Sequence, residues 1–576
     1  MKKILAIVSV ITISGCSLIG FHYHIHNPKR AGKYPKATAA LKTFGDENSR
    51  FRTCYDVTHY DLDVTFPGDL LKEKKITDDV TMDFTALSDF DTIQIDLAET
   101  MKMNTITVSD NIKSTYSRNG EAIYLVFHGE KGKKYSVMMN AEGEPVEAHK
   151  PPWDGGFVRQ QDDLKNPWWG VACETEGASL WFPCKDVVND EPDSVDMYYK
   201  VPEPWVAVGN GNLIGKKVLG GCCNLDEYHW HVSYPINLYD VTFYIGKYKL
   251  LHDTYYSQVT HDTLQLNHYV LEQHYDAAKK DFEQLKDYLA FYEETYGPYP
   301  WYRDGCKLVE SPYEGMEHQT AIAYGHGFKN DPQWGFDYII LHETAHEWWG
   351  NAVTAEDLGD GWIHEGFATY TEALWVEHKF GHEKYLQYLL NYRFLIIDRR
   401  PVSHPYGIRY FDYHDEDIYM KGAWVLHSLR YVINDDSVFF DVLKTYFKTY
   451  EYKNATSRDL EKVVEEKTGK DYKWFFDQYL FDRFVPELEY YVKDGFLYYR
   501  WQKVDSSFAM NVKCSVSDNI GKQTLQTNET DPTYIQRVEY SNPGNIIRFN
   551  DEECLFKPVE NSSLVKSYFK QGCKSL

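Results

Sequence analysis

The stretch HETAHEWWGN, residues 342–351, contains the pattern on which the interpretation of this chain depends. His342 and His346 lie four residues apart, so on a helix both side chains project from the same face. Two imidazoles one turn apart can bind one zinc ion, and Glu343 would lie beside that ion, where a general base for a bound water belongs. The same pattern also fits a core helix whose histidines are satisfied by hydrogen bonds, so the neighbouring sequence has to decide.

Two features of the neighbouring sequence favour the metal site. The helix is otherwise strongly apolar (FDYIIL, residues 336–341), and unpaired buried histidines would be costly there. The stretch GWIHEGFATYTEALW, residues 361–375, predicts a second helix with Glu365 in its first turn, and 18 residues separate this glutamate from His346. Two histidines and a glutamate leave one zinc position open, which is typical of catalytic sites. We therefore expect one zinc ion per chain.

The hydrophobic period changes twice along the chain and predicts a multidomain α+β fold. Residues 50–250 alternate between apolar and polar side chains in short runs, which indicates an antiparallel β domain. Residues 251–485 carry mainly helical spacing, beginning at about residue 265, and predict a mainly helical domain with some strand near its start. Strand patterns return at residues 486–576, which we expect to form a small β module.

The N-terminus has the layout of a secretory signal peptide. A basic start, MKK, precedes the short apolar run ILAIVSVITI and then Cys16. Residues 13–16 (ISGC) resemble the lipobox of bacterial lipoproteins, which implies a signal peptide at residues 1–16 and lipidation of Cys16. The alternatives are an ordinary signal peptide and an uncleaved anchor. With residues 17–49 as a tether, we expect a protein exported and lipid-anchored in the bacterial cell envelope, on the periplasmic side or the cell surface.

The charge of the chain excludes some classes of partner. The formal net charge is −25, and no block of lysine or arginine offsets it. Such a chain repels nucleic acid, so we expect no nucleic-acid partner, and it also repels anionic membrane surfaces. The oligomeric state does not follow from the sequence.

Four motifs, in family order, resemble those of the M1 (gluzincin) aminopeptidases. They are the zinc pattern HExxH followed after 18 residues by Glu, WFPCKDVVNDEP (181–192), SPYEGMEHQTAIAYG (311–325) and IYMKGAWVLHSLR (418–430). The resemblance runs from about residue 50 to about residue 490. It implies a β-rich, saddle-like N-terminal domain, a thermolysin-like, mainly helical catalytic domain and a small C-terminal β-sandwich-like module. It also implies release of N-terminal residues from peptides that have a free N-terminus.

The resemblance assigns roles to individual residues. His342, His346 and Glu365 match the zinc ligands, and Glu343 matches the general base. Tyr419 matches the tyrosine that stabilises the oxyanion. In the segment EGMEH, Gly315, Met316 and Glu317 match the exopeptidase motif, and Glu317 matches the glutamate that binds the α-amine of the substrate.

The chain also departs from the family pattern. Where the family motif begins with glycine and ends with asparagine, this chain has Glu314 and His318, and an imidazole at 318 is bulkier and can titrate. Glu174 stands at the position where we expect the family's amine-binding glutamine, so two carboxylates would face one ammonium. These changes bear on substrate preference.

Glu372 is a further candidate residue of the metal site. Glu372 lies two turns after Glu365 on the same helix face, and we expect it either to accept a hydrogen bond from a ligand histidine or to be a partly exposed helix residue. The alternative functions are a zinc endopeptidase and a catalytically silent, peptide-binding surface lipoprotein.

Overall fold

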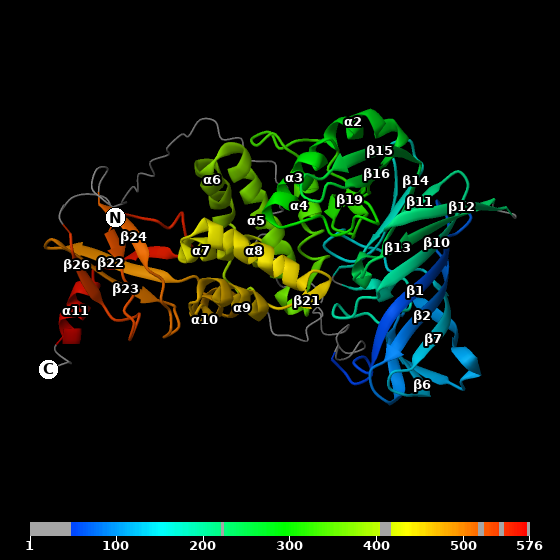
Figure 1. Ribbon diagram of the computed structural model, residues 1–576, viewed down its shortest axis with the longest axis horizontal. Helices are drawn as coiled ribbons and strands as arrows, with labels where there is room; N and C mark the ends of the chain where they lie inside the picture. Colours follow the sequence, from blue (N-terminus) through cyan, green and yellow to red (C-terminus); the bar gives the residue numbers. More distant parts are fainter. Residues whose placement is uncertain are drawn as a thin grey trace, which may run out of the picture.

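The structure is a computed structural model, and it describes residues 48–174, 176–220, 224–403, 416–516, 523–540 and 547–572. Three regions follow one another along the long axis of the molecule in the order of the sequence (Figure 1). A β-rich region forms one end, a mainly helical region forms the middle, and a small β-rich module forms the other end. This is the mixed α+β architecture that the change of hydrophobic period predicts.

The N-terminal region is built on a seven-stranded sheet, and alternation along its strands explains why. In β1, Tyr60, Leu62 and Val64 are buried, whereas the residues between them are partly exposed, so one face packs on the core and the other faces solvent. In sheet order the strands are β12 (Asn212–Gly220), β13 (Leu225–Val232), β10 (Ser194–Pro202), β1 (Tyr55–Thr65), β2 (Ile76–Ala86), β7 (Lys134–Gly143) and β4 (Met101–Val108).

Two smaller sheets complete this region. The strands of the four-stranded sheet are β11 (Val206–Gly209), β14 (Phe243–Gly246), β9 (Pro167–Ala172) and β8 (Gly156–Gln161). Those of the three-stranded sheet are β3 (Phe90–Asp96), β6 (Ala122–Gly129) and β5 (Thr115–Asn119).

The middle region begins with a five-stranded sheet and continues as helices. The strands are β15 (Tyr248–Tyr256), β16 (Thr263–Leu271), β17 (Leu308–Glu310), β19 (Ile322–Tyr324) and β18 (Gly315–Met316). The helices are α2 (Tyr275–Asp281), α3 (Gln284–Thr295), α4 (Tyr338–Ala345), α5 (Trp362–Phe380), α6 (His382–Arg393), α7 (Met420–Ile433), α8 (Asp436–Tyr450), α9 (Ser457–Thr468) and α10 (Lys473–Phe476). A two-stranded sheet joins β20 (Val353–Ala355) to β21 (Lys453–Ala455).

The expected strand near the start of this region is present, but the expectation that helical spacing begins at about residue 265 is wrong. Residues up to Leu271 form β16, which pairs with β15 over its whole length. The apolar residues of this stretch fit both the helical and the strand period, because a strand and a helix follow one another here without a break. Residues up to Leu271 form a strand because they pair with β15.

Helices α5 and α7 cross at two glycines. A Cβ on Gly366 would lie 3.0 Å from the Cα of Gly422, and a Cβ on Gly422 would lie 2.9 Å from the Cα of Gly366. Only two residues without side chains allow so close a backbone approach. This crossing places the start of α7, and with it Tyr419, beside the first turn of α5.

The C-terminal module consists of two small sheets and a final helix. The strands of the larger sheet are β26 (Gln536–Glu539), β23 (Phe496–Gln502), β22 (Glu487–Lys493) and β28 (Lys557–Glu560). The other sheet contains β25 (Gln523–Leu525), β24 (Val512–Val516) and β27 (Ile547–Phe549), and α11 (Leu564–Gly572) follows. Among the helices that the structure describes, none is long and apolar enough to span a membrane.

The glycine crossing predicts a specific sensitivity to an added methyl group. Gly422→Ala should lower the free energy of unfolding, because forcing the helices apart costs about 1–3 kcal/mol, more than the ~1 kcal/mol that the better helix propensity of alanine returns. Urea unfolding measures the change. The matched control is Gly215→Ala, since a Cβ there meets nothing within 4 Å. Equal stability of both variants would contradict the close crossing.

Candidate metal centre

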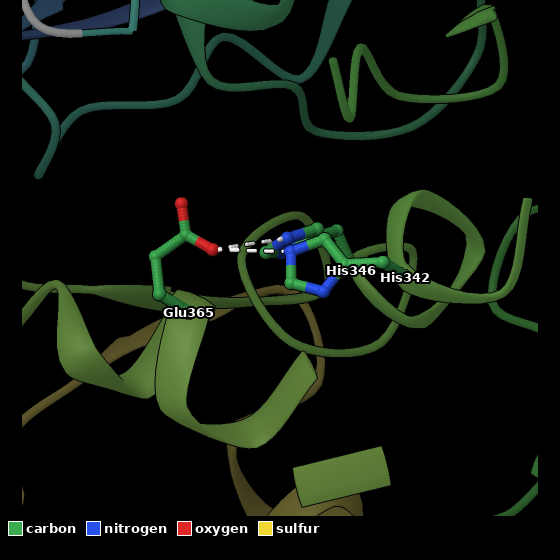
Figure 2. Close-up of side chains that lie close together, drawn as sticks. All are labelled: His342, His346 and Glu365. Atoms are coloured by element: carbon green, nitrogen blue, oxygen red, sulfur yellow. Dashed lines mark hydrogen bonds and ion pairs between the residues drawn. The ribbon is translucent and has the colours of Figure 1, made fainter. Parts of the chain in front are cut away.

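Three side chains from α4 and α5 converge on one point. The Oε2 atom of Glu365 lies 3.3 Å from Nε2 of His342 and 3.5 Å from Nε2 of His346. Figure 2 shows both imidazole rings facing this carboxylate. Asp337 is the N-cap of helix α4, and its side chain accepts a hydrogen bond from the backbone N–H of Ile339. His342 lies in the helix and His346, one turn later, is its C-cap residue. Helix α5 supplies Glu365 from its first turn.

The second nitrogen of each ring already has a partner. Nδ1 of His342 lies 2.7 Å from Oε1 of Glu372, and Nδ1 of His346 lies 2.9 Å from the carbonyl oxygen of Trp349. Because these acceptors keep the proton of a neutral ring on Nδ1, each Nε2 can offer its lone pair to a cation bound at the point they share with Glu365. Two imidazole nitrogens and a carboxylate are a donor set that zinc accepts, and ligands at ~2.0–2.2 Å from tetrahedral zinc lie about 3.3–3.6 Å apart. The residues therefore fit a zinc ion.

Glu372 is buried rather than partly exposed, and two tyrosines orient it. The hydroxyl groups of Tyr388 and Tyr392, both on α6, donate to its Oε2 atom at 2.5 Å each. Its other oxygen is left to His342. The sequence gives no sign of these tyrosines, because only the packing of α6 against α5 brings them to the glutamate.

Glu343 lies against the exopeptidase-like segment. A Cβ on Gly315 would lie 2.3 Å from Oε1 of Glu343, so a larger residue there would have to displace this carboxylate. Met316, the next residue of β18, is buried in the core.

The predicted amine-binding glutamates lie beside the three converging residues. Ligand atoms of Glu317, Glu343 and His346 lie within 4.8 Å of one another, and so do those of Glu174, Glu317 and His364. Glu317 is 3 % exposed and Glu174 is 8 % exposed.

Several contacts fix Glu317 in this position. The Asn351 side chain donates to its backbone carbonyl at 2.8 Å, and the Tyr239 hydroxyl donates to its carboxylate at 3.4 Å. Asn351 is the last residue of the opening motif, so the chain that follows α4 also anchors the segment that carries Glu317.

His364 is a site residue that sequence reasoning missed. Its Nε2 accepts a hydrogen bond from the backbone N–H of Ala355 at 2.9 Å, so the proton of the neutral ring is on Nδ1, a buried atom without a partner. Its position directly before Glu365 is the signal that could have identified it.

His318 is not the titrating group that the sequence suggests. It is fully buried, and its Nδ1 lies 2.7 Å from the Tyr244 hydroxyl of β14. Burial lowers the pKa of His318 to about 3, so the ring is neutral at ordinary pH. In this position it joins β14 to the segment that carries Glu317.

Tyr419 stands at the N-cap of α7, where its ring stacks on His342 with 6.3 Å between the ring centroids. It is half-buried, in contrast to Trp348 and Trp349, which are fully buried core residues. The glycine crossing of α5 and α7 thus sets the position of its ring beside the converging histidines.

Burial and mutual charge determine the protonation of the cluster. Burial raises the pKa of Glu343 to about 8 and also raises that of Glu317. Burial disfavours the ionised form of Glu365 as well, but hydrogen bonds with His342 and His346 outweigh it and hold the Glu365 pKa below its usual range. A divalent cation here would favour the ionised form of each carboxylate, since its charge offsets what burial costs.

The comparisons with known proteins agree with this geometry. Residues 280–479 match the model of the Peptidase family M1 domain. The chain is 26 % identical over 352 residues to mouse endoplasmic reticulum aminopeptidase 1, covering 57 % of this chain and 36 % of that protein. It is 33 % identical over 156 residues to aminopeptidase N of Lactococcus lactis, covering 25 % and 18 %. The chain thus spans about a third of the length of the first curated relatives it matches.

A solved structure shares the fold. The crystal structure of an M1 zinc metallopeptidase from Deinococcus radiodurans matches with a TM-score of 0.64 at 20 % identity, covering 77 % of this chain and 98 % of that one.

The Glu372 contact predicts a loss of metal affinity. Glu372→Gln should weaken zinc binding by about 10–100-fold, because the amide no longer provides a charged acceptor for the His342 N–H. Competition with a chromogenic chelator measures the zinc Kd. Glu377→Gln, on the same helix but bonded to Arg430, is the matched control and should bind zinc normally. An unchanged Kd for Glu372→Gln would show that this contact does not orient His342 for the metal.

Proposed function

Because residues 280–479 are a peptidase family M1 domain, we propose that the protein is a zinc-dependent aminopeptidase that releases N-terminal residues from peptides. His342, His346 and Glu365 are the proposed ligands of one zinc ion. Zinc in this position supplies a Lewis acid that polarises the scissile carbonyl and acidifies water.

The observation that carries the proposal is that two buried carboxylates, Glu317 and Glu174, lie next to the proposed zinc ligands. A ligand atom of Glu317 lies within 4.8 Å of one on Glu343 and one on His346, and Glu174 lies beside Glu317. Burial disfavours an ionised carboxylate, and a substrate ammonium one residue from the scissile bond would favour that form through charge-assisted hydrogen bonds. An endopeptidase would instead place neutral peptide chain against these two charges. The geometry therefore favours the aminopeptidase over the zinc endopeptidase.

Four residues of the chain carry the proposed steps. Glu317 and Glu174 bind the α-ammonium and so fix the scissile bond at the first residue. Glu343 takes a proton from the attacking water at its carboxylate and later gives it to the leaving amine. Tyr419 donates its phenolic hydrogen to the oxygen on which negative charge develops.

Substitution of the base tests the chemistry. Glu343→Gln should lower kcat for an aminoacyl reporter substrate by at least about 10²-fold, because glutamine cannot accept the proton, while zinc content stays near one per chain at this site. Stopped assays with parallel metal analysis measure both. Turnover close to that of the unsubstituted chain would contradict the role of Glu343.

Blocking the substrate amine tests exopeptidase action. A peptide and its N-acetylated form should differ by about 10²-fold or more in kcat/KM, because acetylation removes the charge that Glu317 and Glu174 bind. Equal cleavage of the two peptides would support the endopeptidase. Absence of cleavage in both, with or without added zinc, would support the silent peptide-binding protein.

We also propose that the chain is lipid-anchored in the cell envelope through Cys16. The support is the sequence of residues 1–16, which lies outside the described residues. Cys16→Ser should move the protein from the membrane fraction to the soluble fraction after ultracentrifugation, whereas Ser17→Ala should not. Retention of the Cys16→Ser variant in the membrane fraction would indicate an uncleaved anchor.

A further inference from the structure

A second cluster of imidazole and carboxylate groups lies on the solvent-facing side of the seven-stranded sheet. His59 and Asp61 come from β1, Asp196 from β10, and His229 and His231 from β13, strands that lie side by side (Figure 1). All five side chains are partly exposed, whereas the alternate residues of the same strands are buried. The cluster therefore belongs to the sheet surface and not to the centre formed by α4 and α5.

The two aspartates stand directly opposite each other. Asp61 and Asp196 are register partners in the parallel pair of β1 and β10. Like charges directly opposite each other destabilise a sheet.

The next carboxylates along this face are paired differently. Lys200 lies 2.6 Å from Asp63 and 3.9 Å from Glu227. Within the described residues, no lysine or arginine forms an ion pair with Asp61 or Asp196, whose ion-pair partners are histidines.

The ring of His59 is oriented toward both aspartates. Its Nδ1 lies 2.8 Å from the Ser194 hydroxyl, which leaves Nε2 to face the carboxylates. Nε2 lies 3.8 Å from Oδ1 of Asp61 and 3.6 Å from Oδ2 of Asp196. A shift of register between Val57 and His59 in the pairing of β1 with β2 immediately precedes this ring, and such bulges re-aim side chains.

The other oxygen of Asp196 is occupied by the remaining imidazoles. Oδ1 lies 2.5 Å from Nε2 of His229 and 3.1 Å from Nδ1 of His231. The His229 ring in turn stacks on Tyr198 at 4.2 Å. Two oriented imidazoles thus hold Oδ1, and Oδ2 is left on the side of His59 and Asp61.

We propose that His59 Nε2, Asp61 and the Oδ2 atom of Asp196 form a second divalent-cation site, which takes zinc. Ligand atoms of these three residues all lie within 4.8 Å of one another. Their separations of 3.6 and 3.8 Å from His59 Nε2 approach the ~3.3–3.6 Å expected between ligands of a tetrahedral zinc ion. Ser194, His229 and His231 orient the ligands, and the partial exposure leaves room for water on the ion.

Metal counting in the full chain, purified with detergent present, tests this site independently of catalysis. At a free zinc concentration buffered near the micromolar range, the chain should bind two zinc ions. The double variant His342→Ala/His346→Ala should retain one of them. Adding Asp61→Asn/Asp196→Asn to that double variant should leave none.

The stability of the sheet gives a second measurement. Without zinc, Asp61→Asn/Asp196→Asn should melt at a Tm equal to or above that of the unsubstituted chain, because the opposed charges are gone. Zinc should raise the Tm of His342→Ala/His346→Ala and lose this effect once both asparagines are added. Asp63→Asn, on the same strand and face but bonded to Lys200, is the matched control and should leave the zinc count unchanged.

Two results would overturn the proposal. One is a zinc count of one in the unsubstituted chain that falls to zero in His342→Ala/His346→Ala. The other is an equal loss of zinc in Asp63→Asn, which would show only general attraction of cations to an acidic face. If the asparagine pair fails to fold, His59→Gln, which keeps a polar side chain after the bulge, is measured in its place with the same expected loss of one zinc.

Discussion

The middle of the molecule depends on one carboxylate that two imidazoles share. Glu365 on α5 lies within 3.5 Å of both His342 and His346. These contacts persist only if α4 and α5 keep their crossing angle and the rotation of each helix about its own axis. The neighbouring contacts serve the same geometry: Glu372 and the Trp349 carbonyl fix the second nitrogen of each ring. Moving either helix would leave charged or polar groups buried without partners, which costs far more than an ordinary surface contact contributes.

Close backbone approach extends this constraint to the rest of the centre. Gly366 and Gly422 let α7 bring Tyr419 to the same place, and Gly315 lets β18 pass against Glu343. Asn351 and His318 then attach the Glu317 segment to the chain that follows α4 and to the N-terminal β region. The start of α7, strand β18 and the N-terminal β region are distant in sequence, yet these contacts hold all three beside the proposed zinc ligands. The proposed role of the buried carboxylates Glu174 and Glu317 in binding the substrate amine depends on this placement, because they lie beside the proposed zinc ligands.

Much of this arrangement could be predicted because it is local in sequence. The spacing of His342 and His346 determines a shared helix face, and alternation along β1 identifies its buried side. The helical assignment of residues 265–271 failed because the deciding contact, pairing with β15, is not local. The tyrosines around Glu372 were missed for the same reason, since tertiary packing alone brings them to the site. The position of His364 directly before Glu365, in contrast, is a signal that the sequence contains. His318 was misjudged because its chemistry in solution differs from its chemistry in a fully buried position.

The most direct test of the account is anomalous diffraction at the zinc edge from crystals of the protein. We expect a peak about 2.0–2.2 Å from Nε2 of His342, Nε2 of His346 and a carboxylate oxygen of Glu365, with Glu343 beside the ion and not bound to it. A zinc-loaded crystal with no peak between these three residues, or with Glu343 as a ligand in place of Glu365, would contradict the account.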